Sequence, residues 1–237
     1  MDSVSNIMWF KRLLATGVMC FASTYAFAAG MLPETTVIIL NEADGETSLN
    51  VKNTDPQAAL LYSRIENIPE DTEQLVVLTP PVARLEANET QLVRFIKQSP
   101  QPLKVQRLKR VIFEGINQNP RKPGQAQIGV TFRQNLPLII HPSGLPKNSE
   151  PWKLLKWSIS NNHLVVKNDS PYVARLAQNV QLLPINKSID LRRSYVLAGE
   201  TISIPTTVKA TTATSVRISP ATVYGFSVDY YSTSLQQ

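Results

Sequence analysis

The sequence predicts an all-β protein made of two β-sandwich domains. Seventeen prolines in 237 residues argue against long helices, because proline lacks the backbone donor that a helix interior needs. Short runs of alternating apolar and polar residues recur along the chain between Asn, Asp, Gly and Pro clusters. A proline-rich interruption separates two series of such runs. The first series is long enough for an immunoglobulin-like sandwich of seven or more strands.

Residues 1–28 are predicted to form a secretory signal peptide. Lys11 and Arg12 supply the positive start, residues 13–27 form a short apolar segment, and the Ala-Phe-Ala at 26–28 is a cleavage site. The apolar segment is shorter than the ~20 residues that a membrane-spanning helix needs. We therefore expect export, followed by cleavage that leaves residues 29–237.

The composition excludes several classes of function. The only cysteine, Cys20, lies within the predicted signal, so the exported chain must rely on core packing without disulfides. The basic excess, 24 Lys and Arg against 18 Asp and Glu, is dispersed rather than clustered, which argues against a nucleic-acid partner. His141 and His163 are the only histidines. They are too few for a metal site and have no nucleophile pattern nearby. We predict no enzyme, no catalytic residue, no metal, no cofactor and no small-molecule substrate.

The first domain is expected to span residues 29–141 and to contain eight strands. These are predicted at 35–40, 47–53, 58–65, 75–78, 83–87, 90–96, 107–114 and 127–140. Residues 142–151, with three prolines and a glycine, form the predicted linker. The second domain, 152–237, has further β segments at 154–160, 163–168, 173–182, 197–204 and 216–231.

The strand predicted at 127–140 is longer than the ~5–6 residues of an ordinary strand. Its second part, 136–140, is expected to fill the core of its own domain. In its first part Ile128, Val130 and Phe132 share one face, because alternate residues of a strand point the same way. This part follows a polar loop, where an edge strand would overhang. Exposed apolar edges promote aggregation unless a partner covers them, so these three residues are predicted to bind another protein.

Four blocks of sequence identify a family resemblance. Residues 78–95, LTPPVARLEANETQLVRF, resemble the first domain of the periplasmic pilus-assembly chaperones of Gram-negative bacteria, which act in the chaperone–usher pathway. The blocks NVKN at 50–53, KNDSPY at 167–172 and VLAGE at 196–200 are similar to further family elements. They occur in the family's order, and the resemblance covers nearly the whole predicted mature chain.

The resemblance implies two immunoglobulin-like domains set at an angle and a location in the periplasm. It also implies that the last strand of the first domain is lent to a pilus subunit whose own fold lacks a strand. In this donor-strand complementation, the backbone ladder and alternating side chains hold the subunit until it passes to an outer-membrane usher. When Pro142 is aligned with the proline that ends the family's donor strand, the donor residues fall on Ile128, Val130 and Phe132.

The sequence departs from the family at the residues that anchor the subunit's terminal carboxylate. Common members hold the subunit's terminal carboxylate with an Arg on the first strand and a Lys on the donor strand. Here Val37, or its neighbour Thr36, and Pro137 stand at those places, and none of them is charged. Divergent members carry an Arg in the penultimate strand, which corresponds to Arg110. A guanidinium binds a carboxylate with two hydrogen bonds and stays charged when partly buried. We therefore predict Arg110 as the anchor.

Four questions stay open at this point. Lys109 and Arg133 are the other candidates for the anchor, although Lys109 should point to the opposite side of the strand. The basic residues at 107–110 could instead form a solvated face. His141 stands where relatives often have an Arg that braces the domains, and its role is left open. Finally, the chain could be an exported structural or adhesive pilus protein, although it lacks the apolar N-terminal extension and disulfide typical of subunits.

Overall fold

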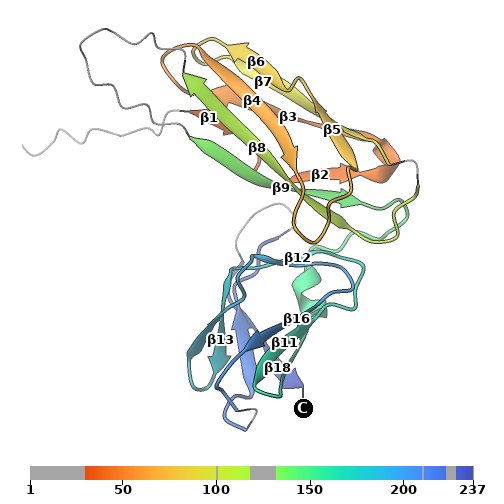
Figure 1. The fold of residues 1–237 in the computed structure, drawn as a ribbon, viewed down its shortest axis with the longest axis vertical. Helices are drawn as coiled ribbons and strands as arrows, with labels where there is room; N and C mark the ends of the chain where they lie inside the picture. The colour runs from red at the N-terminus through yellow and green to blue at the C-terminus, as the bar shows by residue number, and fades with distance from the viewer. Residues whose placement is uncertain (1–29, 100, 118–131, 210, 223–227, 237) are drawn as a thin grey trace, which may run out of the picture.

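The computed structural model describes residues 30–99, 101–117, 132–209, 211–222 and 228–236. In this part of the chain the regular elements are β-strands and two short 3-10 helices, η1 (Glu42–Asp44) and η2 (Pro151–Leu154). They form two β-sandwich bodies that meet at a bend, with the first body in red to green and the second in green to blue (Figure 1). The predicted all-β, two-domain class is confirmed. Among the described helices none is long and apolar enough to cross a membrane.

The first body packs two sheets face to face. The four-stranded sheet has the order β1-β3-β7-β5 and the five-stranded sheet the order β2-β9-β8-β4-β6. Their bounds are β1 (Met31–Pro33), β2 (Ile38–Asn41), β3 (Glu46–Asn53), β4 (Ala59–Glu66), β5 (Val76–Thr79), β6 (Val82–Leu85), β7 (Thr90–Lys97), β8 (Arg107–Asn117) and β9 (Arg133–His141). Alternate residues such as Leu49 and Val51 of β3 and Val93 and Phe95 of β7 are buried between the sheets. The apolar residues that recur at every second position of the sequence therefore form the inward face of each strand.

The second body has its own core. A seven-stranded sheet runs β14-β13-β17-β18-β10-β11-β16, and β12 pairs with β15 beside it. The bounds are β10 (Lys156–Ser160), β11 (His163–Lys167), β12 (Ala174–Arg175), β13 (Asn179–Leu183), β14 (Lys187–Asp190), β15 (Tyr195–Val196), β16 (Thr201–Pro205), β17 (Ser215–Ile218) and β18 (Tyr231–Gln236). Trp152, on η2, and Trp157, on β10, are nearly fully buried in this core.

Several predicted strand boundaries were wrong. The strand predicted at 35–40 begins only at Ile38, and Met31–Pro33 forms an additional strand on the other sheet. The segment 173–182 is two strands, β12 and β13, that belong to different sheets. Its apolar alternation continues through the point where the chain leaves one sheet, so periodicity alone could not show the break. Of the strand predicted at 127–140, residues 127–131 lie outside the described residues.

A third, smaller apolar cluster joins the two bodies. Val37, Ile68, Leu108 and Ile139 of the first body bury themselves with Val173 of the second, and Ile39, Tyr195 and Leu197 pack against them. Because this contact removes apolar surface of both bodies from water, it stabilises the bend between them.

Polar contacts at the bend are specific. The Gln106 N–H donates to Pro171 O at 2.8 Å, and the Val173 N–H donates to Gln106 Oε1 at 2.8 Å. At another point Glu70 of the first body accepts hydrogen bonds from Tyr195 Oη, at 2.9 Å, and from Arg193. Burial and the bond to Glu70 raise the pKa of Tyr195 to about 12, so this phenol stays protonated and keeps donating.

Candidate functional site

Strand β9 presents an open backbone edge. On one side it pairs with β8 over its length, from Arg107↔Ile140 to Glu114↔Arg133. On the other side β2 pairs with it only from Ile38↔Leu138 to Asn41↔His141. Among the described strands, residues 133–137 of β9 therefore have a ladder partner on one side alone. Such an edge can accept a strand of another chain.

Apolar side chains stand exposed at the start of this edge. Phe132 directly precedes β9 and is 45% exposed, and Ile116 on β8 is 44% exposed. Leu136, Leu138 and Ile140 of β9 belong to the first core, as expected for 136–140, whereas Ile139 lies in the interdomain cluster. The other two predicted donor residues, Ile128 and Val130, lie outside the described residues.

Arg110 lies beside the open edge in the adjacent strand. Its Cα partners are Pro137 on β9 and Glu66 on β4. Its Nε donates to Asn135 Oδ1 and its Nη2 to Asn135 O, both at 2.6 Å. No carboxylate of the described residues forms an ion pair with it. Burial lowers the pKa of Arg110, and the nearby Tyr195 and Glu66 oppose this shift. The arginine remains a cation.

Lys109 points to the other face of the sheet, as strand alternation predicts. Its side chain is 1% exposed, and its Nζ lies 2.8 Å from both Asp71 O and Asp71 Oδ1. Arg107 binds the same carboxylate with two hydrogen bonds of 2.6 Å. A solvated basic face at 107–110 is therefore wrong. The charge of Lys109 is already compensated within the fold.

Asp71 gives the first body an acid-sensitive element. Burial alone would raise the pKa of Asp71, but the hydrogen bonds from Arg107 and Lys109 bring it below its ordinary value. A carboxyl whose folded pKa is depressed stabilises the fold fully above its unfolded pKa of ~3.9, and this contribution is lost as the pH falls through the lower folded value. The stability difference between wild type and Asp71→Asn should therefore shrink below about pH 4. Urea unfolding at pH 7 and pH 3 measures this difference, and a constant difference would contradict the assignment.

The remaining anchor candidate is Arg133, and the two positions where common family members have cations are the uncharged Val37 and Pro137. The Nη2 of Arg133 donates to Glu66 Oε1 at 2.6 Å, and this side chain is 46% exposed. Val37 is buried in the interdomain apolar cluster and Pro137 is buried on β9. The cation nearest to Pro137 along the ladder is thus on the neighbouring strand, at Arg110.

Sequence reasoning did not single out Arg175, which the fold brings to the same region. Arg175 on β12 is the Cα partner of Tyr195 on β15, and Tyr195 packs on the interdomain cluster. The positive charge of Arg110 contributes to a lowered pKa of Arg175, after the larger effect of burial. The charge of Arg110 therefore acts on Arg175, which is 65 residues away in the sequence. No local signal could have predicted the position of Arg175, because its strand β12 and the partner strand β15 have only two residues each.

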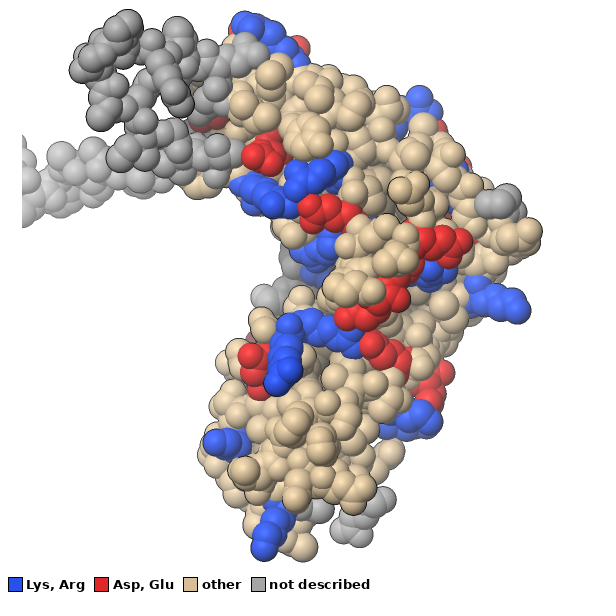
Figure 2. Space-filling view, in the orientation of Figure 1, with Lys and Arg blue, Asp and Glu red and all other residues tan. Residues whose placement is uncertain are grey.

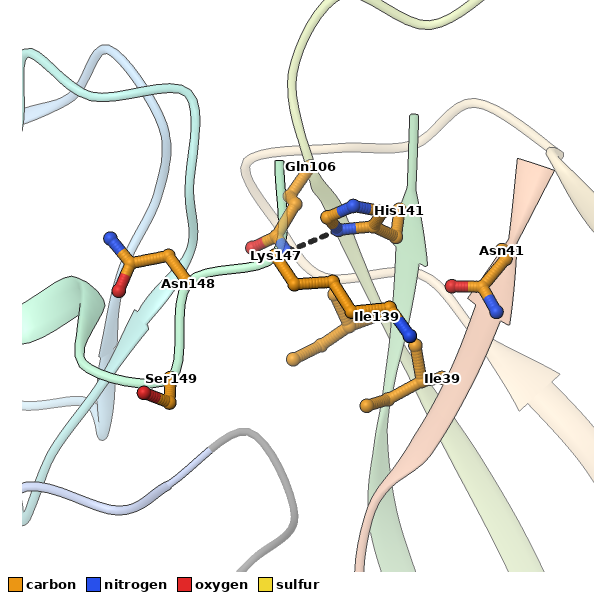
Figure 3. Close-up of a pocket in the computed structure, with 8 residues that line it drawn as sticks. All are labelled: Ile39, Asn41, Gln106, Ile139, His141, Lys147, Asn148 and Ser149. Atoms are coloured by element: carbon orange, nitrogen blue, oxygen red, sulfur yellow. Dashed lines mark hydrogen bonds between the residues drawn. The ribbon is translucent and has the colours of Figure 1, made fainter. Parts of the chain in front are cut away.

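A cavity of about 390 Å³ lies at the junction, lined among others by Ile39, Ile139, His141 and Lys147 (Figure 3). His141 connects β9 to the linker. Gln106 Nε2 lies 2.9 Å from His141 Nδ1, and His141 Nε2 lies 2.9 Å from Leu145 O. Because Gln106 Oε1 already accepts from a backbone N–H, its amide donates to Nδ1, and Nε2–H donates to Leu145 O. His141 thus supports Gln106, which bridges the domains. In the described residues no His, Cys, Asp and Glu side chains gather into a metal site.

Two family models match the chain in succession. The model described as pili and flagellar-assembly chaperone, PapD N-terminal domain, matches residues 30–146, and the PapD C-terminal domain model of pili assembly chaperones matches residues 150–232. The uncharacterized fimbrial chaperone YhcA of Escherichia coli (strain K12) is 38% identical over 226 residues, covering 95% of this chain and 99% of that protein. The chaperone protein HifB of Haemophilus influenzae is 27% identical over 184 residues, covering 71% of this chain and 76% of its own length.

Solved structures share the fold. A chain of the Salmonella enterica SafA pilin complex with the SafB chaperone aligns with a TM-score of 0.72 at 19% identity, covering 88% of this chain and 98% of that chain. The E. coli chaperone DraB aligns with a TM-score of 0.69 at 17% identity, covering 87% of this chain and 99% of its own.

Proposed function

Because the chain belongs to the family of PapD-like pilus-assembly chaperones, we propose that it holds pilus subunits by lending them the open edge of β9. The protein is a fimbrial assembly chaperone, and an exported structural or adhesive protein is not favoured. The observation that supports the proposed mechanism is the edge of β9 at 133–137, which has no partner on its outer side among the described strands and begins beside the exposed Phe132.

Ile128, Val130 and Phe132 are proposed as the donor side chains. Each would bury its apolar surface in a subunit and contribute on the order of 1.5–3 kcal/mol. Three such contributions are a large share of the ~5–15 kcal/mol by which a domain is usually stable. The subunit would then be stable only while it is held, which would prevent premature assembly.

Arg110 is proposed as the anchor of the subunit's terminal carboxylate. It lies one strand from the open edge, beside Pro137, and has no ion-pair partner among the described residues. Arg133 is the weaker candidate because Glu66 binds it, and Lys109 is the weakest because Asp71 encloses it.

The proposed cellular context follows from the family and the predicted signal. We propose that residues 1–28 direct export and are removed, that the two domains span 29–141 and 152–237, and that the protein works in the periplasm. The partners would be pilus subunits and an outer-membrane usher. The family is one of chaperones, so we propose no catalytic activity, no cofactor and no nucleic-acid or small-molecule partner. SafB, a structural neighbour, is described in complex with a pilin.

Co-expression tests the function directly. The chain would be produced in the periplasm with the pilus subunit encoded beside its gene. A soluble one-to-one complex is expected, with the subunit degraded when the chaperone is absent. A subunit that survives equally well alone, or assembly of this chain itself into fibres, would contradict the proposal.

Replacing the anchor should separate binding from folding. Arg110→Ala is expected to reduce subunit recovery about tenfold or more, because a hydrogen-bonded charge pair contributes ~1.5–3 kcal/mol. The melting temperature should change little, since among the described residues the Arg110 side chain donates hydrogen bonds to Asn135 alone. Arg94→Ala, which removes an exposed arginine on the other sheet, is the matched control. Unchanged recovery with Arg110→Ala would move the anchor to Arg133 or Lys109.

A further inference from the structure

Gln106 links the two domains through both its backbone and its side chain. Its N–H donates to Pro171 O, and its Oε1 accepts the N–H of Val173, both at 2.8 Å. The residue is 6% exposed, so water does not readily replace a hydrogen bond that the amide loses. The orientation of this amide therefore helps to fix the second domain against the first.

The other end of the same amide contacts His141. Gln106 Nε2 lies 2.9 Å from His141 Nδ1, and His141 Nε2 lies 2.9 Å from Leu145 O (Figure 3). Because Gln106 Oε1 accepts from Val173, its Nε2–H donates to the imidazole, and Nδ1 accepts only when it carries no proton. The bridge between the domains thus requires a neutral His141 with its proton on Nε2.

A proton on Nδ1 would set two donors against each other. Protonated imidazole donates from both nitrogens, so Nε2–H keeps its bond to Leu145 O while Nδ1–H faces the N–H₂ of Gln106. If the amide turns over, its oxygen accepts from Nδ1–H, but its N–H₂ then faces the N–H of Val173. Either arrangement leaves buried donors without an acceptor. Protonation of His141 therefore opposes the bridge, whichever way the amide points.

The charged groups on the elements around His141 do not relieve this conflict. They are Lys147 of the linker, Glu42 of η1, which pairs with Lys97 and accepts the N–H of Ser143, and Arg107 of β8, which pairs with Asp71. Among the described residues no carboxylate bonds to the imidazole. A proton on Nδ1 would thus have no acceptor other than Gln106.

The other polar contact at the bend is insensitive to mild acid. Burial would raise the pKa of Glu70, but its hydrogen bonds and the charge of Arg193 bring that pKa below its ordinary value. Glu70 therefore stays ionised and keeps accepting from Arg193 and Tyr195. Figure 2 shows acidic and basic side chains next to one another where the two bodies meet. An imidazole differs from these groups, because imidazoles titrate near pH ~6.5.

We propose that His141 is a pH-sensitive switch of the angle between the two domains. The neutral ring holds Gln106 in the orientation that binds the second domain, and protonation in mild acid releases that domain. Since β9 leads through His141 into the linker, release would move the second domain relative to the open edge of β9. The inference concerns the free chain and does not depend on how a subunit is held.

A distance measurement between two spin labels tests the inference. The exported chain has no cysteine once the predicted signal with Cys20 is removed, so Leu92→Cys on β7 and Thr201→Cys on β16 label one exposed position in each domain. The distance distribution should be narrow at about pH 7.5 and broad at about pH 5.5, with the released population rising about tenfold. His141 and His163 are the only histidines, so NMR can follow both rings, and the broadening should coincide with the protonation of His141.

Two substitutions should remove the pH response for different reasons. His141→Gln cannot titrate, so its distribution should be the same at both pH values. Gln106→Glu offers two acceptor oxygens, one for the N–H of Val173 and one for Nδ1–H of the charged ring, so this variant should stay narrow at about pH 5.5. His163→Gln, which removes the histidine at the start of β11, is the matched control and should broaden as wild type does.

Three results would overturn the switch. One is a wild-type distribution that stays narrow although NMR shows His141 protonated. Another is equal broadening in His141→Gln, which would assign the response to a different group. The third is broadening of Gln106→Glu to the wild-type extent, because the donor conflict would then not be its cause. Retention of the pilus subunit at neutral pH is measured separately, and the proposed function would survive each of these results.

Discussion

Val130→Asp combined with Phe132→Arg should abolish recovery of the pilus subunit and leave the chaperone folded. The two side chains would otherwise be buried in the subunit at ~1.5–3 kcal/mol each, so their loss corresponds to at least about a hundredfold weaker complex. A charged group in each position adds the cost of an unpaired buried charge. The chaperone itself loses little, because Phe132 is 45% exposed in the free chain. Co-purification and a thermal melt measure the two effects.

Two control variants distinguish loss of subunit binding from loss of folding. Leu92→Arg changes another exposed apolar residue, 46% exposed on β7 of the other sheet, and should leave subunit recovery unchanged. Leu138→Asp changes a fully buried residue of β9 and should unfold the first domain. If the double variant unfolds as Leu138→Asp does, its residues belong to the core. If it retains the subunit, the donor assignment is wrong.

The second large effect concerns stability. Asp71→Ala should destabilise the first domain by about 3–5 kcal/mol, because it leaves the buried ammonium of Lys109 without its carboxylate. The Lys109 side chain is 1% exposed and that of Asp71 8% exposed, so water cannot replace the lost charge. Urea unfolding at neutral pH measures the loss.

The neighbouring acid is a matched control. Glu73 accepts a hydrogen bond from Arg107 at 3.0 Å but is 60% exposed, so Glu73→Ala should cost at most about 1 kcal/mol. Replacing the pair together, as Asp71→Leu with Lys109→Met, should recover part of the stability, because the apolar pair needs no charge compensation and Arg107 keeps Glu73 as its partner. Equal effects of Asp71→Ala and Glu73→Ala would contradict a buried ion pair.

Local pattern was sufficient for much of the first domain. The strands around Leu49, Val93 and Leu108 were predicted from alternation, because a residue's inward or outward direction follows from its place in the strand. The same rule placed Lys109 and Arg110 on opposite faces. The prediction that 136–140 fills the core holds for Leu136, Leu138 and Ile140.

Prediction failed where distant segments decide the outcome. Strands β12 and β15 have two residues each, too few for any period to show, and they exist because Ala174 and Arg175 pair with Val196 and Tyr195. The burial of Lys109 depends on Asp71, which is 38 residues away in the sequence. Neither the residues around Lys109 nor those around Asp71 form a local pattern that predicts the other residue.

The sequence by itself determined the all-β class, the two-domain order and the resemblance to pilus-assembly chaperones, and through that resemblance it predicted Arg110 as the carboxylate anchor. These follow from periodicity and from motifs, which are properties of adjacent residues. Only the tertiary structure decided that β2 pairs with residues 138–141 of β9 alone and that the charge of Arg110 acts on Arg175. Both depend on where one sheet edge ends and how two domains meet, and long-range packing rather than local chemistry sets those distances.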